Sequence, residues 1–270
     1  MEEPDFYPIL APGMKQNRTI QEVIQEGGKY FMPSVSLDCV IFGFHENQLK
    51  VLLLKMKNMD QWALPGGFIY KNEDIEDAAI RVLRERTGLH DIFLQQFRVF
   101  GQPNRAEKKY HLNMMKKDGI RVGKDNWIIQ RFITVGYYAL VDFAVVTPEP
   151  DMNSISCEWH DLHSITEMFM DHKNILDTAL QTLRLQLNHQ PIGYNLLPQK
   201  FTMPELQKLY ETILDKKLDR RNFQRRMNSF GFVKRLKETR KGGAHKAPFL
   251  YSFDLRKYKK ALLEGLQGGW

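Results

Sequence analysis

The sequence predicts an α+β protein of two domains, the second of which is a winged helix-turn-helix. Its 270 residues are enough for about two domains of roughly 150 residues each. Up to about residue 190, runs of β-branched and aromatic residues are mixed with runs of helical periodicity. The rest indicates a helix, a turn, a second helix and a basic hairpin, which is the order of elements in a winged helix-turn-helix.

The elements of the first domain follow from two hydrophobic periods. Residues 33–44 and 49–56 flank a short polar turn and predict a hairpin, and residues 129–145 predict another long strand. Apolar residues at helical spacing predict helices over 73–87 and 174–187. Because both kinds of element occur, we expect a mixed α and β core.

Breaks in these patterns set the domain limits. Residues 1–30 lack a strong period and are expected to form an irregular N-terminal arm. The first domain then spans residues 31–190, including a polar and basic insertion at 104–128 that is expected to be a loop or hairpin. The prolines that follow interrupt the helical pattern, so the second domain is expected over residues 191–270.

The second domain contains clear helix start signals. Thr202 is the expected N-cap of a helix over 202–214, and Asp219 is the expected N-cap of a second helix that ends before Gly231. Two strands are expected after it, at residues 232–240 and 248–254. The loop between them is basic and rich in glycine.

The second of these helices has two different faces. At 100° per residue, one stripe is apolar and is formed by Phe223, Met227 and Phe230. The opposite face carries Arg221, Arg225 and Asn228, residue types that bind base edges and phosphates in a major groove. We therefore predict a DNA-reading helix and a basic loop able to enter a minor groove. The candidate DNA-binding residues are Arg220, Arg221, Asn222, Gln224, Arg225, Asn228, Arg240, Lys241, His245 and Lys246.

The distribution of charge agrees with a polyanion partner. Residues 1–200 carry 22 Lys and Arg against 25 Asp and Glu, whereas residues 201–270 carry 17 against 7. A C-terminal segment with a net charge of +10 attracts phosphate backbones. A solubilising basic tail and an RNA-binding module are the alternatives. The apolar stripe in the same segment favours a folded double-stranded DNA-binding domain over the tail.

Several function classes are disfavoured by composition. No apolar run reaches the 18 or more residues that cross a bilayer, and the first residues are acidic, so we expect a cytoplasmic protein without a membrane partner. Cys39 and Cys157 are the two cysteines. Without a paired cysteine motif, neither a disulfide framework nor a structural metal site is expected.

One motif in the first domain points to pyrophosphate chemistry. The segment Trp62 to Phe68 reads WALPGGF, and the matching positions that follow are Glu73, Arg81, Leu83, Glu85, Gly88 and Leu89. With Gly67 they resemble the Nudix box of pyrophosphohydrolases. This resemblance implies an α/β/α sandwich, an ion pair between Glu73 and Arg81 that braces the loop, and a ligand pocket beside Gly66 and Gly67.

Two positions of the box depart from the family pattern. Val82 and Arg86 stand where the family has glutamates that hold Mg²⁺ or Mn²⁺. Residues three and four apart are neighbours on a helix, so Val82, Glu85 and Arg86 together carry no net charge. We therefore expect no metal site, no cofactor, and absent or feeble hydrolysis. The vestigial positions are Glu73, Arg81, Val82, Glu85 and Arg86, and the candidate ligand-binding residues are Gly66, Gly67, Glu85 and Arg86.

Both domains together resemble the NrtR-like Nudix-related transcriptional regulators, including their sugar-responsive AraR-like members. The resemblance extends from about residue 33 to 254 and includes the segments 169–176, 196–198, 201–211 and 218–223. It implies a homodimer that binds an operator and whose Nudix domain senses a small-molecule effector: a pentose, ADP-ribose or a nucleotide sugar. The alternative is an active Nudix pyrophosphohydrolase on a nucleoside-diphosphate-linked substrate, with Mg²⁺ or Mn²⁺ held by carboxylates outside the box such as Glu107 or Asp118.

Overall fold

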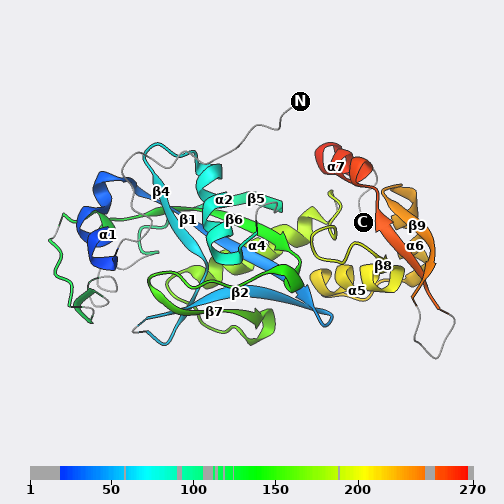
Figure 1. The fold of residues 1–270 in the computed structure, drawn as a ribbon, viewed down its shortest axis with the longest axis horizontal. Helices are drawn as coiled ribbons and strands as arrows, with labels where there is room; N and C mark the ends of the chain where they lie inside the picture. Colours follow the sequence, from blue (N-terminus) through cyan, green and yellow to red (C-terminus); the bar gives the residue numbers. More distant parts are fainter. Residues whose placement is uncertain are drawn as a thin grey trace.

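A computed structural model of the chain describes residues 19–57, 59–89, 93–105, 112, 115–117, 119–123, 125–187, 189–240 and 247–266. In Figure 1 a large N-terminal domain built on a seven-stranded sheet lies beside a smaller C-terminal domain with a three-stranded sheet. Within the described part of the chain, none of the helices combines the length and the apolar character needed to cross a bilayer.

The first domain contains the longer elements. They are α1 (Ile20–Glu26), η1 (Gly27–Lys29), β1 (Phe31–His45), β2 (Gln48–Met56), β3 (Trp62–Ala63), β4 (Gly66–Tyr70), α2 (Ile75–Thr87), β5 (Phe93–Phe100), η2 (Trp127–Ile129), β6 (Ile133–Val141), η3 (Phe143–Val145), β7 (Ser154–Asp161), η4 (Leu162–Ser164) and α4 (His172–Gln186).

The sheet of this domain is mixed. Its strands follow the order β3-β2-β1-β6-β5, and β4 and β7 pair with β1 and β2 respectively. Strand β1 runs parallel to β6 and antiparallel to β2. Glu46 and Asn47 close the β1–β2 turn with φ values of 49° and 62°, the left-handed backbone that two-residue hairpin turns require. The predicted hairpin is therefore confirmed.

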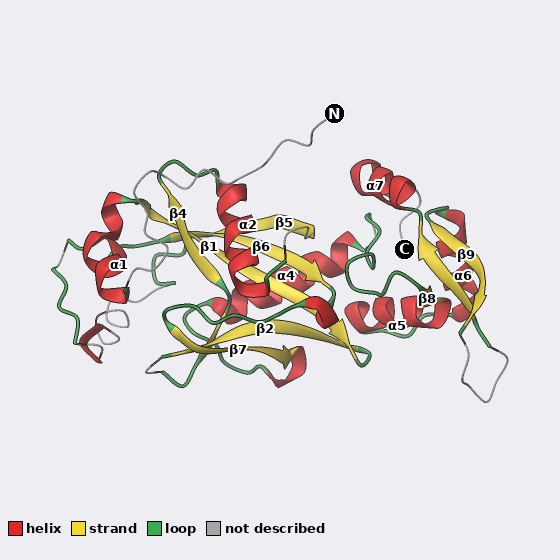
Figure 2. Ribbon diagram, in the orientation of Figure 1, coloured by secondary structure: helices red, strands yellow, loops and turns green. Residues whose placement is uncertain are grey.

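One helix covers each face of the sheet (Figure 2). Because successive strand residues point to opposite faces, Cys39 and Ile41 of β1 pack in a core with α2, whereas Val40 and Phe42 pack in a core with α4. This arrangement confirms the predicted α/β/α layers. Both cysteines are buried free thiols, and burial raises the pKa of each.

Part of the N-terminal arm forms a helix that the sequence interpretation did not predict. Thr19 and Glu22 make a capping box at the start of α1, in which Thr19 N donates to Glu22 Oε2 at 2.8 Å. The helix packs Ile24 against Ile129 and other residues of the 104–128 region and its border. Asn126 Nδ2 also donates to the Ile24 carbonyl at 2.9 Å. The arm and the insertion thus stabilise each other.

The second domain has the predicted order of elements. These are β8 (Phe201–Thr202), α5 (Met203–Leu214), α6 (Arg220–Ser229), β9 (Val233–Thr239), β10 (Phe249–Phe253) and α7 (Leu255–Glu264), with sheet order β8-β10-β9. Thr202 and Asp219 cap α5 and α6 as predicted. The short strand β8 and the helix α7 were not predicted. The winged helix-turn-helix is confirmed.

A single apolar core continues from one domain into the other. Leu183 of α4 belongs to the same cluster as Leu209 and Ile213 of α5. Hydrogen bonds also join the domains: for example, Arg184 Nε donates to the Ile213 carbonyl at 2.7 Å, and Thr212 Oγ1 donates to the Asn47 carbonyl at 3.1 Å. The two domains are therefore packed together rather than merely linked.

Candidate functional site

The loop between β4 and α2 is held by a half-buried ion pair. Arg81 Nε donates to Glu73 Oε1 at 2.7 Å, and a second guanidinium nitrogen donates to Glu73 Oε2 at 2.8 Å and to the Phe68 carbonyl at 2.9 Å. Glu73 also accepts from the Tyr70 backbone N–H at 3.1 Å. A bidentate pair of this kind fixes both side chains and the loop between them.

The two departures from the Nudix box have different surroundings. Val82 is 1% exposed and packs into the core beneath α2. A Cβ built on Gly67 would lie only 2.7 Å from Val82 Cγ2, so valine and glycine are closely fitted. Arg86 lies at the last turn of α2, where it donates to the Glu149 carbonyl at 3.2 Å and to Glu85 Oε2 at 3.3 Å.

These residues do not fit the divalent ion of the Nudix reaction. The Glu85 carboxylate is paired with the guanidinium of Arg86 and also lies 3.5 Å from that of Arg81, and the third position is an apolar side chain. Hard cations require several oxygen ligands. Among the residues that the structure describes, no three histidine, cysteine, aspartate or glutamate side chains gather closely enough to hold a metal ion.

A cavity of about 180 Å³ lies beside the glycine loop. Its walls come from β1, β2, the loop before β4, the border of the insertion and the segment before α4. Of the predicted ligand-binding residues, Gly66 and Gly67 line this cavity, whereas Glu85 and Arg86 are not among its lining residues. Gly66 approaches β1 so closely that a Cβ there would lie 2.6 Å from Asp38 Oδ1.

A buried polar cluster that the sequence interpretation missed forms one wall of the cavity. Arg105 binds Asp171 through two hydrogen bonds of 3.0 Å and lies 3.4 Å from Asp38 Oδ2. Asp38, Arg105 and His172 are each less than 9% exposed. Buried charges need partners, so a carboxylate inside the apolar run of β1 is the sequence signal for such a cluster.

His172 is held as a neutral imidazole in this cluster. Its Nδ1 accepts a hydrogen bond from the Leu64 backbone N–H at 2.9 Å, which leaves the proton on Nε2, 3.8 Å from Asp38 Oδ1. Burial lowers the pKa of His172, although the nearby carboxylates of Asp38 and Asp171 oppose this effect. The imidazole can therefore donate one hydrogen bond toward Asp38 or a ligand.

Aromatic and aliphatic side chains form another wall. Phe68, Phe132 and Ile128 line the cavity. Trp127 packs edge-on against Phe68, with ring centroids 4.7 Å apart, and its Nε1 donates to the Ile24 carbonyl of α1 at 3.2 Å. The border of the insertion thus supplies part of the cavity wall and ties it to the N-terminal helix.

The predicted DNA-reading face of α6 is exposed to solvent. Phe223 and Met227 are buried, and Phe230 is half-buried and stacks on Phe232. The side chains exposed to solvent are Arg220, Arg221, Asn222, Arg225 and Asn228, and Gln224 is half-buried. Arg225 donates to Asn222 Oδ1 at 3.0 Å, which orients both side chains on the helix surface.

The basic loop of the hairpin is only partly described. Arg240 donates to the Glu205 carboxylate and, at 3.5 Å, to the Lys200 carbonyl, so its guanidinium is turned toward the body of the domain. Lys241, His245 and Lys246 lie outside the described residues.

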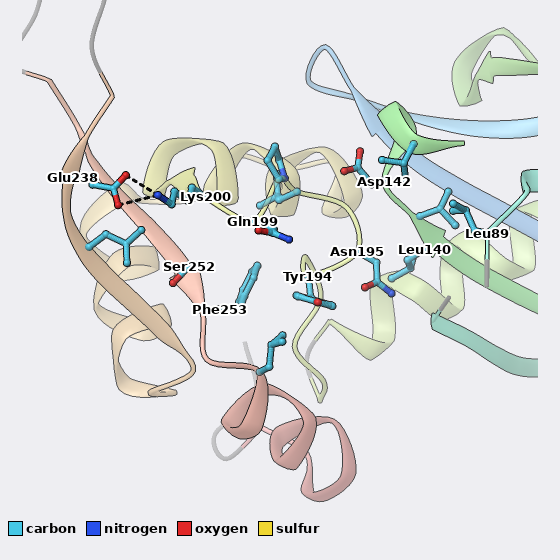
Figure 3. Close-up of a pocket in the computed structure, with 16 residues that line it drawn as sticks. Leu89, Leu140, Asp142, Tyr194, Asn195, Gln199, Lys200, Glu238, Ser252 and Phe253 are labelled. Carbon is cyan, nitrogen blue, oxygen red and sulfur yellow. Dashed lines mark hydrogen bonds and ion pairs between the residues drawn. The ribbon is translucent and has the colours of Figure 1, made fainter. Parts of the chain in front are cut away.

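A second, larger cavity of about 760 Å³ lies between the two domains (Figure 3). Leu140 and Asp142 line it from the end of β6, and Tyr194 and Phe253 line it from the second domain. Lys200 and Glu238, both of the second domain, form an ion pair at 2.8 Å on one side of the cavity. Its walls therefore change whenever the domains move relative to each other.

Comparison with known proteins identifies both domains. Residues 32–179 match the NUDIX domain and residues 193–253 match the NrtR DNA-binding winged helix domain. The chain belongs to the Nudix family. This Nudix protein is 29% identical over 236 residues to the "ADPR responsive transcriptional repressor NtrR" of Acinetobacter baylyi, covering 85% of each chain. It is therefore a homologue of these DNA-binding repressors, which confirms the predicted resemblance.

Two further similarities bear on the fold and the box. The crystal structure of Shewanella oneidensis NrtR complexed with a 27mer DNA superposes with a TM-score of 0.68 at 23% identity, covering 87% of this Nudix protein and 99% of the other chain. The "ADP-ribose pyrophosphatase" of Methanocaldococcus jannaschii is 33% identical over 89 residues, which are 32% of this chain and 50% of the relative.

Proposed function

We propose that this Nudix protein is an effector-responsive transcriptional regulator that binds double-stranded DNA through α6. The observation that carries the proposal is the exposed face of Arg221, Arg225 and Asn228 in a winged helix of the NrtR type. Arginine and asparagine are the residue types that bind guanine and adenine edges in the major groove. The name of the Acinetobacter relative supports repression. A homodimer would place two such helices on one operator.

The proposed effector occupies the cavity beside Gly66 and Gly67. Two classes remain from the family resemblance, a sugar and an ADP-ribose-like metabolite, and the name of the Acinetobacter relative supports the second. The charges around the cavity support a sugar. Among the described lining residues Arg105 is the one lysine or arginine, and Asp38 and Asp171 already bind it. Asp38 and Asp151 would repel a pyrophosphate, whereas carboxylates accept hydrogen bonds from neutral hydroxyls.

The size of the cavity also supports a sugar as the effector. About 180 Å³ is less than the roughly 300–1,000 Å³ of drug-sized ligand sites. The apolar wall of Phe68 and Phe132 suits the face of a sugar ring. A thermal-shift screen separates the classes, because a ligand that binds only the folded state at 100 times its Kd stabilises it by about 2.7 kcal/mol. Stabilisation by ADP-ribose but by no pentose would contradict a neutral effector.

DNA binding is tested with a mobility shift on duplex DNA from the promoter region of the protein's own gene. We expect a specific shift at moderate salt that responds to the effector. Arg225→Ala should remove the preference for particular bases, whereas Lys241→Ala should weaken binding to all sequences by a similar factor. Absence of a specific shift, with and without candidate effectors, would refute the proposal.

Loss of hydrolysis is part of the proposal. The Val82 and Arg86 positions support it because neither side chain can hold a divalent cation. The rival function, a working pyrophosphohydrolase, is supported by the partial similarity to an ADP-ribose pyrophosphatase. Incubation with Mg²⁺ or Mn²⁺ and ADP-ribose discriminates the two. Turnover that is abolished by Glu85→Gln would establish the rival.

A further inference from the structure

Helix α7 follows the matched winged helix segment, which ends at residue 253, and it docks on the protein through one face. Tyr258 is 6% exposed, and its hydroxyl donates to the Pro191 carbonyl at 2.9 Å. The rings of Phe232 and Phe253 pack against it. Leu262 also accepts at its carbonyl from Gln190 Nε2 at 3.4 Å. This face fixes the helix against the segment that joins the two domains.

The opposite face of α7 is basic. At 100° per residue, Arg256 and Lys260 lie on the side away from Tyr258, and Lys259 lies on the flank of that side, with the 89% exposed Leu263 among them. All three cations are exposed. Lys260 has an i,i+4 partner in Glu264 at 3.7 Å, with both side chains largely in solvent, and such a pair binds weakly. Three cations on one side of a docked helix form a surface whose partner must be anionic.

The position of this surface relates it to the DNA-reading helix. The hairpin of β9 and β10 pairs Val233 with Phe253 at one end and Thr239 with Phe249 at the other, where the basic loop begins. Helix α6 ends shortly before Val233, and α7 begins shortly after Phe253. At this end of the hairpin, a hydrogen bond of 2.7 Å runs from Asp254 N to the Phe232 carbonyl. In Figure 1, α7 lies at the upper end of this hairpin and α6 lies alongside it.

Lys257 marks how close the two helices are. A Cβ at Gly231, the glycine that follows α6, would lie 4.0 Å from Lys257 Nζ. This ammonium therefore lies near the carbonyl end of α6, where a cation is favoured by the helix dipole. Lys257 thus has a structural reason for its position and is not counted as part of the basic surface.

We propose that Arg256, Lys259 and Lys260 bind backbone phosphates of DNA beside the groove that α6 enters. This inference rests on the proposed DNA-binding function. It adds a contact surface outside the matched domain, at the opposite end of the hairpin from the basic loop. Phosphate contacts position a protein on the duplex without reading its sequence. A lipid surface is disfavoured because a membrane-bound helix inserts a broad apolar face. In α7, Tyr258 is docked on Pro191 and Phe232, and the apolar side chains left exposed are Leu255 and Leu263.

Salt dependence of DNA binding measures the number of phosphate contacts. The test variant carries Arg256→Gln, Lys259→Gln and Lys260→Gln. The matched control carries Lys29→Gln, Lys116→Gln and Arg121→Gln, three exposed cations of η1 and the insertion at the other end of the molecule. Both remove the same charge from the full chain. The slope of log K against log salt becomes shallower by about 0.9 for each phosphate that the protein no longer binds.

We expect the α7 variant to lose roughly 2 to 3 units of slope per protomer between about 50 and 200 mM salt. The loss should be the same on promoter DNA and on a mixed-sequence duplex, and base preference should not change. The control should retain the wild-type slope within half a unit, about half of one phosphate contact. Thermal unfolding of all three proteins checks that each is folded.

Four outcomes would overturn the inference. If the wild type binds the promoter specifically and the α7 variant keeps its slope, the α7 surface fails while the proposed function stands. If the control and the α7 variant lose slope equally, the loss comes from the lower net charge of the protein and not from contacts made by α7. If the α7 variant keeps its DNA slope but loses binding to phosphatidylglycerol vesicles, the surface belongs to a membrane. A wild type that binds no DNA ends both the inference and the proposed function.

Discussion

At the scale of single residues, the glycine loop and α2 pack closely because Gly67 has no side chain where Val82 has one. The side chain of Val82 occupies the space in front of Gly67, and the glutamate of the family motif would extend into the same place with a charge. A buried carboxylate without a cation is costly, so valine at this position stabilises the fold. A side chain at this position can either carry a charge that holds a cation or fill the apolar core, but it cannot do both.

Gly67→Ala should lower the free energy of unfolding by about 1–3 kcal/mol through overpacking against Val82. Val82→Ala should cost a similar amount through the cavity that it leaves. The double variant should cost less than the sum, by about 0.5–3 kcal/mol, because the new methyl group occupies part of the cavity. Urea unfolding measures all three. Gly101→Ala is the control, since its Cβ would lie 3.5 Å from Ile133, and additive costs would contradict the fit.

His172 predicts how stability depends on pH. Burial lowers its pKa in the folded protein below the ordinary 6.5, so the unfolded chain binds the proton first as the pH falls. The contribution of His172 to stability is therefore present above about pH 6.5 and is lost as the pH falls through the lower folded value, by up to about 1.4 kcal/mol per pH unit. His172→Asn should make this decline shallower between pH 7 and pH 5.

The control for this prediction is His163→Gln, which changes a solvent-exposed histidine and should leave the profile as in the wild type. Asp38, Asp171 and Arg105 are the charged groups that face His172. A profile of His172→Asn that is as steep as that of the wild type would show that another group is responsible.

At the scale of elements, local signals were sufficient for some segments and insufficient for others. Capping residues and apolar stripes predicted α5 and α6 because both signals lie within a few neighbouring residues. Strands β5 and β7 were missed because their exposed faces and polar residues hide the period, and pairing with β6 and β2 decides their structure. Helix α1 has a capping box, but its seven residues are too few to show a clear apolar period.

The candidate site likewise contains residues that local sequence signals predicted and residues that they did not. The glycines of the Nudix box were predicted to lie beside a ligand pocket because the motif is contiguous, and Gly66 and Gly67 do line a cavity. The cluster of Asp38, Arg105 and His172 comes from three distant segments. No local pattern joins such residues, so tertiary structure was required to find them.

The N-cap of α6 gives a prediction for one element. Asp219 accepts from the Asn222 backbone N–H at 2.9 Å. Asp219→Ala should lower the free energy of unfolding by about 1 kcal/mol, whereas Asp219→Asn should cost a few tenths at most, because asparagine caps as well as aspartate. Urea unfolding measures both. The two variants remove the same charge, so equal destabilisation would show that the carboxylate acts electrostatically rather than as a cap.

At the scale of the whole molecule, the contact of α4 with α5 connects the proposed effector cavity to the winged helix domain. The cavity beside Gly66 is bounded by His172 at the first turn of α4, and the same helix ends against α5 of the winged helix domain. The interdomain cavity gives the second domain room to shift on this contact. Coupling between the two sites is therefore expected to depend on the few bonds that join α4 to α5.

Arg184 is the side chain that tests this route. Arg184→Gln removes the hydrogen bond to the Ile213 carbonyl at 2.7 Å and the weak ion pair with Asp215 at 3.9 Å. Neither binding surface contains Arg184, so effector and DNA should each bind the variant with nearly wild-type affinity. The factor by which one ligand changes the affinity for the other, typically about 5 to 150-fold in allosteric proteins, should become smaller.

The measurement is a pair of titrations, of DNA with and without saturating effector and of effector with and without DNA. By linkage the two factors must agree in each protein. Lys173→Gln is the control, because it removes an exposed ion pair with Asp177 on the same helix and should leave the factor unchanged. A wild-type factor in Arg184→Gln would show that the coupling passes through the shared apolar core instead, since that core is the other contact that joins α4 to α5.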